Sequence, residues 1–131
     1  VFPPSKNVQE IFGHLGKVVP IETIEVFDAF VVASATMGLY FDTLETMAQW
    51  LCSKGADYSS ARTYLTTVYS GLAQTASTQH GLSFAALSTG HSTPNGLNQH
   101  VVEQFHTNGG PDAVLAAFKS VEAQMKKLSQ V

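Results

Sequence analysis

Charged side chains are scarce in this sequence. Only 13% of its residues are charged, against about a quarter in typical soluble domains. The seven lysines and arginines include a single arginine, and the formal net charge is −3. No basic stripe is available to follow a phosphate backbone, so we expect no nucleic-acid partner. So few charges on a chain that is 44% hydrophobic also predict that much of its surface is covered in an interface.

Cysteine is nearly absent, and signal sequences are not evident. Cys52 is the only cysteine, which excludes a disulfide within the chain. No signal-peptide pattern stands at the start of the sequence, so we expect a reducing, cytoplasmic setting. The longest apolar stretch, residues 26–40, is interrupted by polar residues and is shorter than a bilayer span. We therefore expect a buried helix there and no membrane partner.

The sequence lacks the glycine-rich and catalytic motifs of several enzyme classes. It contains no G-x-G-x-x-G, no P-loop and no G-x-S-x-G, so these residues are not expected to bind a dinucleotide or to act as a serine hydrolase. Its five histidines lack the spacing of a zinc site, and we expect no metal. The 131 residues are too few for a nucleotide-binding domain and a second domain. Because the sequence opens on Val1, we expect a fragment of a longer protein.

Apolar periodicity predicts an all-α bundle. Thr23 and Asp57 are expected N-caps, as is Ser5 or Asn7. The predicted helices cover residues 7–15, 23–54, 57–76, 83–88, 96–105 and 111–128. Residues 23–54 form either one long helix or two helices that are broken near residues 36–38. The only predicted strand is 17–21, and Pro20 would confine it to a sheet edge.

Two polar patches interrupt this apolar pattern. Residues 90–100 form a small polar loop that runs into a helix, whose free N–H groups could hold a carboxylate or phosphate. The alternative is that Ser92, Thr93 or Asn95 simply caps its own helix. The second patch, residues 34–38, places hydroxyls and a glycine within an apolar helix, where the hydroxyls can also bond back to the preceding turn. Two such patches together are typical of a pocket.

The order of these features resembles the C-terminal part of pyrroline-5-carboxylate reductases. In that family the helix break reads Ser-Gly-Ser-Gly-Pro-Ala-Tyr and the loop reads Ser-Pro-Gly-Gly-Thr-Thr. The corresponding segments here are Ser34-Ala35-Thr36-Met37-Gly38-Leu39-Tyr40 and Thr93-Pro94-Asn95-Gly96-Leu97-Asn98. Four positions match outright: Ser34, Tyr40, Pro94 and Gly96. Leu97 and Asn98 replace the two loop threonines, so we expect a substrate shaped differently from pyrroline-5-carboxylate.

The resemblance implies a domain arrangement and a function. Residues 1–21 would be the tail of a missing Rossmann domain, a helix plus an edge strand, and residues 22–131 would be a helical dimerisation and substrate domain. The missing domain would bind NADP or NAD, and the whole enzyme would reduce a small imine or carbonyl compound as a homodimer joined by its central helices. This fragment alone is expected to be inactive. The alternative is a non-catalytic helical dimerisation or regulatory module that has kept only the fold.

The resemblance also assigns roles to individual residues. Asn98 and Thr36 are the expected catalytic side chains. The expected substrate-binding residues are Ser34, Thr93, Asn95, Gly96 and Leu97. The backbone N–H groups of Gly96, Leu97 and Asn98 would face the substrate's anionic group.

Overall fold

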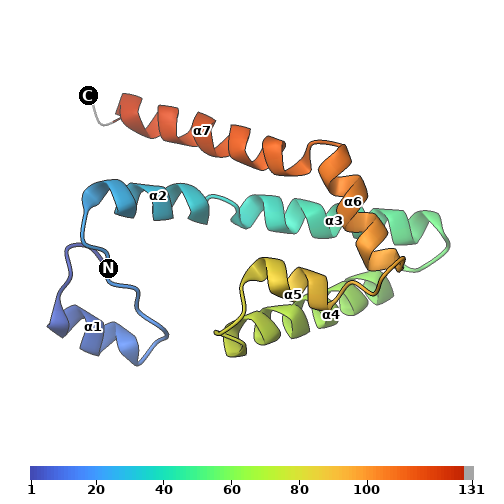
Figure 1. Cartoon of the computed structure of the whole chain (residues 1–131), viewed down its shortest axis with the longest axis horizontal. Coiled ribbons are helices and arrows are strands. Elements are labelled where there is room, and N and C mark those ends of the chain that lie inside the picture. The colour runs from blue at the N-terminus through green and yellow to red at the C-terminus, as the bar shows by residue number, and fades with distance from the viewer. Residues whose placement is uncertain (129–131) are drawn as a thin grey trace. The chain divides into compact units, whose positions relative to one another are not determined.

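The computed structural model describes residues 1–128, and all regular secondary structure in this range is helical (Figure 1). This confirms the predicted all-α class. The helices are α1 (Lys6–Gly13), α2 (Ile24–Ser34), α3 (Met37–Ser53), α4 (Tyr58–Thr78), α5 (Phe84–Gly90), α6 (Leu97–Thr107) and α7 (Gly110–Leu128). Their bounds lie close to the predicted ones, except in the long segment that holds α2 and α3.

Short polar side chains begin four of these helices. Each accepts a hydrogen bond from a backbone N–H of the first turn, which satisfies a donor that has no partner within the helix. The acceptors are Ser5 for α1, Thr23 for α2, Asp57 for α4 and Ser83 for α5. The caps expected at Thr23 and Asp57 are confirmed, and Ser5 is the cap of α1.

The long apolar segment is two helices, because the chain leaves the helical path at Ala35 and Thr36. The Ser34 hydroxyl donates to the carbonyl of Val31 at 2.7 Å, and the Thr36 hydroxyl donates to the carbonyl of Ala33 at 2.8 Å. These bonds compete with the helical hydrogen-bond ladder, as serine and threonine do when they occur within a helix. Of the two predicted arrangements, the broken one is therefore correct.

The predicted strand at residues 17–21 is wrong. These residues are irregular. Val19 O accepts from the amino group of Val1, and Ile21 N–H donates to Val1 O at 3.0 Å. A strand needs a partner with a continuous ladder of hydrogen bonds. Here Val1 is the one residue that pairs with the segment in these two bonds, and Pro20 has no N–H that could donate to a ladder.

The chain divides into two compact units. One unit comprises residues 1–37 together with residues 113–128, and it buries Ile21 and Val32. The other unit comprises residues 38–112. Its core lies between α3 and α4, where Ala48, Ala61 and Leu65 are buried. The domain boundary expected between residues 21 and 22 stays a prediction.

Many large apolar side chains remain exposed in the single chain. Phe30 of α2 is 50% exposed, and Trp50 of α3 is 61% exposed. The segment Ile24–Ser53 has a mean hydropathy of 1.5 in its most apolar window, of which 6% is buried. By length and composition alone it could cross a membrane, so the short length of residues 26–40 does not exclude a span. The absence of a membrane partner stays a prediction.

Candidate functional site

A tight turn from Thr93 to Gly96 leads into α6. The N–H of Gly96 donates to the carbonyl of Thr93 at 2.8 Å. Between them lie Pro94 and Asn95, and Asn95 has a φ of 58°. A type II turn prefers proline at its second position and needs a positive φ at its third, which asparagine tolerates better than most residues. The sequence Pro94-Asn95-Gly96 therefore determines this turn.

Gly96 is required here because the chain folds closely over it. A Cβ on Gly96 would lie 2.8 Å from the carbonyl oxygen of Thr93 and closer still to Thr93 Oγ1. Its φ of −85° is open to any residue. The requirement for glycine is therefore steric and comes from Thr93.

The start of α6 has no side-chain cap. Gly96 is its N-cap residue and makes no side-chain hydrogen bond, in contrast to the caps of α1, α2, α4 and α5. The interpretation that Ser92, Thr93 or Asn95 caps this helix is therefore wrong, and the Ser92 hydroxyl donates instead to the carbonyl of Ser88 at 2.9 Å. Within residues 1–128, no side chain accepts from the N–H groups of Leu97 and Asn98. Together with the helix dipole, such groups favour an anion.

Two side chains of α6 hold the loop in place. Asn98 donates from Nδ2 to the carbonyl of His91 at 2.8 Å. The Oε1 atom of Gln99 accepts from the N–H of Asn95 at 2.9 Å. An asparagine amide carries two donor hydrogens and one acceptor oxygen. Asn98 can therefore fix the loop and still offer a hydrogen-bonding group to a ligand.

The predicted site residues fall into two groups. Thr93, Asn95, Gly96, Leu97 and Asn98 come together at the turn and at the first residues of α6. Ser34 and Thr36 lie at the break between α2 and α3, in the other compact unit. The N–H of Gly96 is used by the turn, so the expectation that it faces the anion is wrong. The N–H groups of Leu97 and Asn98 remain candidates, and the roles predicted for the side chains stay predictions.

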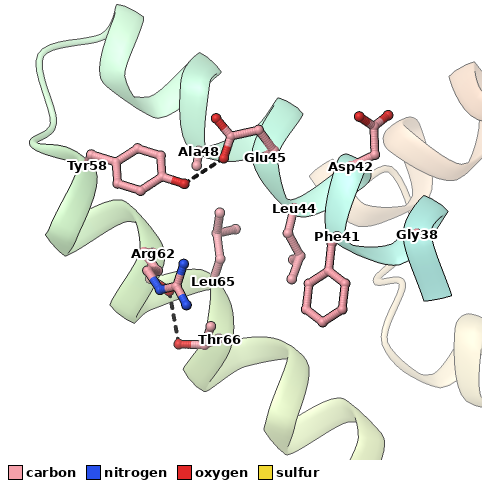
Figure 2. Close-up of a pocket in the computed structure, with 10 residues that line it drawn as sticks. All are labelled: Gly38, Phe41, Asp42, Leu44, Glu45, Ala48, Tyr58, Arg62, Leu65 and Thr66. Carbon is pink, nitrogen blue, oxygen red and sulfur yellow. Dashed lines mark hydrogen bonds between the residues drawn. The ribbon is translucent and has the colours of Figure 1, made fainter.

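A pocket between α3 and α4 was not foreseen from the sequence (Figure 2). Its volume is about 440 Å³. Tyr58 donates its hydroxyl hydrogen to Glu45 Oε2 at 2.6 Å, as Figure 2 shows, and Gln49 donates to Glu45 Oε1 at 2.7 Å. The bond from Tyr58 is the largest cause that lowers the pKa of Glu45, and the same bond raises the pKa of Tyr58. Only the antiparallel packing of the two helices brings these residues together, so no local sequence signal marks the pair.

A second groove lies between α2 and α7 within the unit that holds both segments. Its volume is about 700 Å³. Its walls include apolar side chains such as Val32 and Phe118, and charged ones such as Asp28 and Lys119. At one edge, Lys126 and Glu122 form an ion pair of 2.7 Å. Among residues 1–128, no three His, Cys, Asp or Glu side chains gather in a way that could hold a metal ion.

A comparison with protein-family models shows which family this chain belongs to. The family model described as pyrroline-5-carboxylate reductase dimerisation matches residues 25–128. The chain belongs to this family. A comparison with curated proteins gave no match. The match begins at the first turn of α2 and ends with α7, so the α3–α4 core and the loop before α6 are parts of the pyrroline-5-carboxylate reductase dimerisation domain.

Proposed function

We propose that this chain is the dimerisation and substrate-side domain of an NAD(P)H-dependent reductase, which reduces a small imine or carbonyl compound that bears a carboxylate. The observation that carries the proposal is the uncapped start of α6, formed by the Thr93–Gly96 turn. In a dimerisation domain of the pyrroline-5-carboxylate reductase family, a site for an anion fits a substrate-side role.

The site would work by orientation. The N–H groups of Leu97 and Asn98 would hold the substrate carboxylate, and the Asn98 side chain would add a hydrogen bond beside them. No lysine or arginine occurs between Arg62 and Lys119, so a helix start supplies the positive potential that this stretch of sequence otherwise lacks. Holding the substrate in one pose lowers the entropic part of the barrier to its reduction.

A nicotinamide dinucleotide, NADP or NAD, would supply the hydride. Its binding requires a glycine-rich turn between a strand and a helix. Residues 1–128 contain neither a strand nor such a turn, so the dinucleotide does not fit on this part of the chain. We propose that a separate Rossmann domain, of which residues 1–21 would be the tail, binds it. The present chain alone would then be inactive.

The domain would act as a homodimer. The exposed apolar side chains of α2 and α3, such as Phe30 and Trp50, would be covered by a second copy. An obligate interface of this kind buries about 2,000 Å² or more in total. The segment Ile24–Ser53 would then be apolar because it forms this interface.

A second candidate function is a dimerisation or regulatory module without catalysis. The observation that favours it is the pair Leu97 and Asn98, which stand where the resemblance places two threonines. Leucine offers no side-chain hydrogen bond to a substrate. The module would keep the interface and would not turn over any imine.

A pair of substrates separates the two functions. The full-length protein would be assayed for oxidation of NADPH and of NADH with a small cyclic imine that bears a carboxylate, and with the same imine without it. The proposal predicts turnover of the first imine and a loss of about tenfold or more in kcat/KM for the second, the value of roughly one charge-assisted hydrogen bond. A dimer that oxidises neither dinucleotide with either imine would be the module.

A further inference from the structure

Two Asn-Gly dipeptides flank α6, namely Asn95-Gly96 and Asn108-Gly109. Asparagine followed by glycine is prone to spontaneous deamidation, because a residue without a Cβ leaves its backbone nitrogen open to the preceding side chain. We propose that Asn95 is a deamidation site, and that the carboxylate formed there weakens binding of the anionic substrate at the start of α6. The second half of this statement rests on the proposed function.

The reaction needs only water. The Gly96 nitrogen gives up its proton to water and attacks Cγ of Asn95, so that a C–N bond forms. The Cγ–Nδ2 bond then breaks, and the amide nitrogen takes up a proton from water and leaves as ammonia. Water then opens the five-membered imide. Attack at Cγ gives aspartate, and attack at the backbone carbonyl gives isoaspartate, in which the chain runs through Cβ and Cγ. Either product carries one more negative charge, and neither step changes an oxidation state.

Hydrogen bonds distinguish Asn95 from Asn108. Asn108 donates from Nδ2 to the carbonyl of Gln104 at 2.7 Å, and its own N–H donates to the same carbonyl at 3.0 Å. Its side chain is therefore fixed against α6. Asn95 is exposed, lies outside the helices and makes no side-chain hydrogen bond to any of residues 1–128. Its Cγ is free to rotate toward the Gly96 nitrogen.

The turn itself slows the reaction at Asn95. The Gly96 N–H that must lose its proton donates to Thr93 O at 2.8 Å, and Gln99 Oε1 holds the N–H of Asn95 at 2.9 Å. Attack requires that both of these hydrogen bonds break. Removal of the Gln99 side chain should therefore speed deamidation at Asn95 and leave Asn108 unaffected.

The new charge would stand immediately before the N-cap of α6. A carboxylate is favoured there by the helix dipole, and it repels a second anion that approaches the same N–H groups. Two like charges about 4 Å apart in water repel by an energy equivalent to about a fivefold change in affinity. Deamidated protein should therefore bind the carboxylate-bearing substrate about fivefold or more weakly.

The chemical half is tested by ageing the full-length protein in mildly alkaline buffer and mapping its peptides by mass spectrometry. Trypsin leaves residues 63–119 in one peptide, so fragmentation compares both Asn-Gly sites in the same molecule. A gain of about one mass unit should accumulate at Asn95 several-fold faster than at Asn108, and faster again in the Gln99→Ala protein. An Asn95→Gly protein keeps a residue that accepts the positive φ and should lose the signal at that position. No gain at Asn95, or a faster gain at Asn108, overturns the proposal.

The effect of the new charge on substrate binding is tested with Asn95→Asp, which carries the same charge as the deamidated product. Its KM for the carboxylate-bearing imine should exceed that of Asn95→Gly by about fivefold or more, and the two should have equal KM for the imine without the carboxylate. Equal KM values for the charged imine would overturn the functional half. If mass spectrometry still finds deamidation at Asn95, such a result locates the error in the proposed anion site and leaves the modification in place.

Discussion

The side-chain amide of Asn98 donates a hydrogen bond of 2.8 Å to the backbone carbonyl of His91, and so ties the first turn of α6 to the residue that follows α5. We predict that Asn98→Ala lowers kcat/KM of the full-length protein on its true substrate by the equivalent of about 1–3 kcal/mol in transition-state free energy. The substitution removes both the hydrogen bond to His91 and a proposed substrate contact. The dimer should stay intact. Steady-state kinetics and sedimentation of the variant measure the two effects.

Asn108→Ala is the matched control for Asn98. Asn108 also donates its side-chain amide to a backbone carbonyl, that of Gln104 at 2.7 Å, at the other end of α6. The two substitutions remove the same type of bond, so their melting temperatures should fall by similar amounts. If Asn98→Ala and Asn108→Ala reduce kcat/KM equally, Asn98 has only a structural role.

The Thr93–Gly96 turn gives a prediction about stability. Gly96→Ala should destabilise the chain by about 1–3 kcal/mol, because the added Cβ would meet Thr93 O at 2.8 Å and Thr93 Oγ1 closer still. Gly90→Ala is the control, since nothing lies within 4 Å of a Cβ at this last residue of α5. Urea unfolding of both variants measures the difference. Equal unfolding free energies for the two would mean that the turn does not hold this close approach in solution.

The hydrogen bond between Glu45 and Tyr58 predicts a dependence on pH. The folded pKa of Glu45 is lowered from 4.5, so the bond's contribution to stability is complete above 4.5 and is lost as the pH falls through the folded pKa. The pKa of Tyr58 is raised from 10.0, so the contribution is complete below 10.0 and is lost as the pH rises through that folded pKa. The stability difference between wild type and Tyr58→Phe should therefore shrink at both extremes.

NMR titration of the Glu45 carboxylate tests this bond directly. Tyr58→Phe should move the pKa of Glu45 upward toward 4.5, because its largest cause of lowering is gone. Tyr64→Phe removes an exposed hydroxyl from the same helix and should leave that pKa in place. A Glu45 pKa that Tyr58→Phe does not raise would show that the bond is absent in solution.

Exposed phenylalanines give a prediction about association. Phe30→Glu should weaken the proposed dimer by about 2 kcal/mol or more, because it would bury a charge in the interface. Phe12→Glu is the matched control: Phe12 is 53% exposed against 50% for Phe30, and it lies on α1, before the family match begins at residue 25. Sedimentation over a dilution series compares the two. Equal weakening by both variants would show that α2 has no special part in the interface.

The sequence predicted what local chemistry determines. Thr23 and Asp57 could be recognised as caps because each acts on an N–H three residues ahead. The sequence left open whether residues 23–54 form one helix or two, and the structure has a break where the hydroxyls of Ser34 and Thr36 bond to backbone carbonyls. The sequence did not predict contacts between residues that lie far apart in the chain. Residues 17–21 form no strand because strand formation depends on a partner, and the bond from Tyr58 to Glu45 exists only once α3 and α4 pack antiparallel.

The loop at residues 90–100 likewise has features that could be predicted from the sequence and features that could not. The turn glycine and the start of a helix at this place could be predicted from the order Pro94-Asn95-Gly96 before a helix. Two hydrogen bonds of the loop could not be predicted, because they form only once the loop has folded. These are the bond from Gly96 N–H to Thr93 O and the bond from the Asn98 side chain to His91 O. The sequence therefore predicted the turn and the helix start, but not the hydrogen bonds that hold them, and the binding site itself stays a prediction.

Pairing of this chain with a second copy of itself underlies both the proposed interface and the proposed role of the domain beside the substrate. Sedimentation velocity of the chain at micromolar concentration measures this pairing. We expect a single species of twice the chain mass of 14.0 kDa. A single species of 14.0 kDa, unchanged as the concentration is raised, would contradict it.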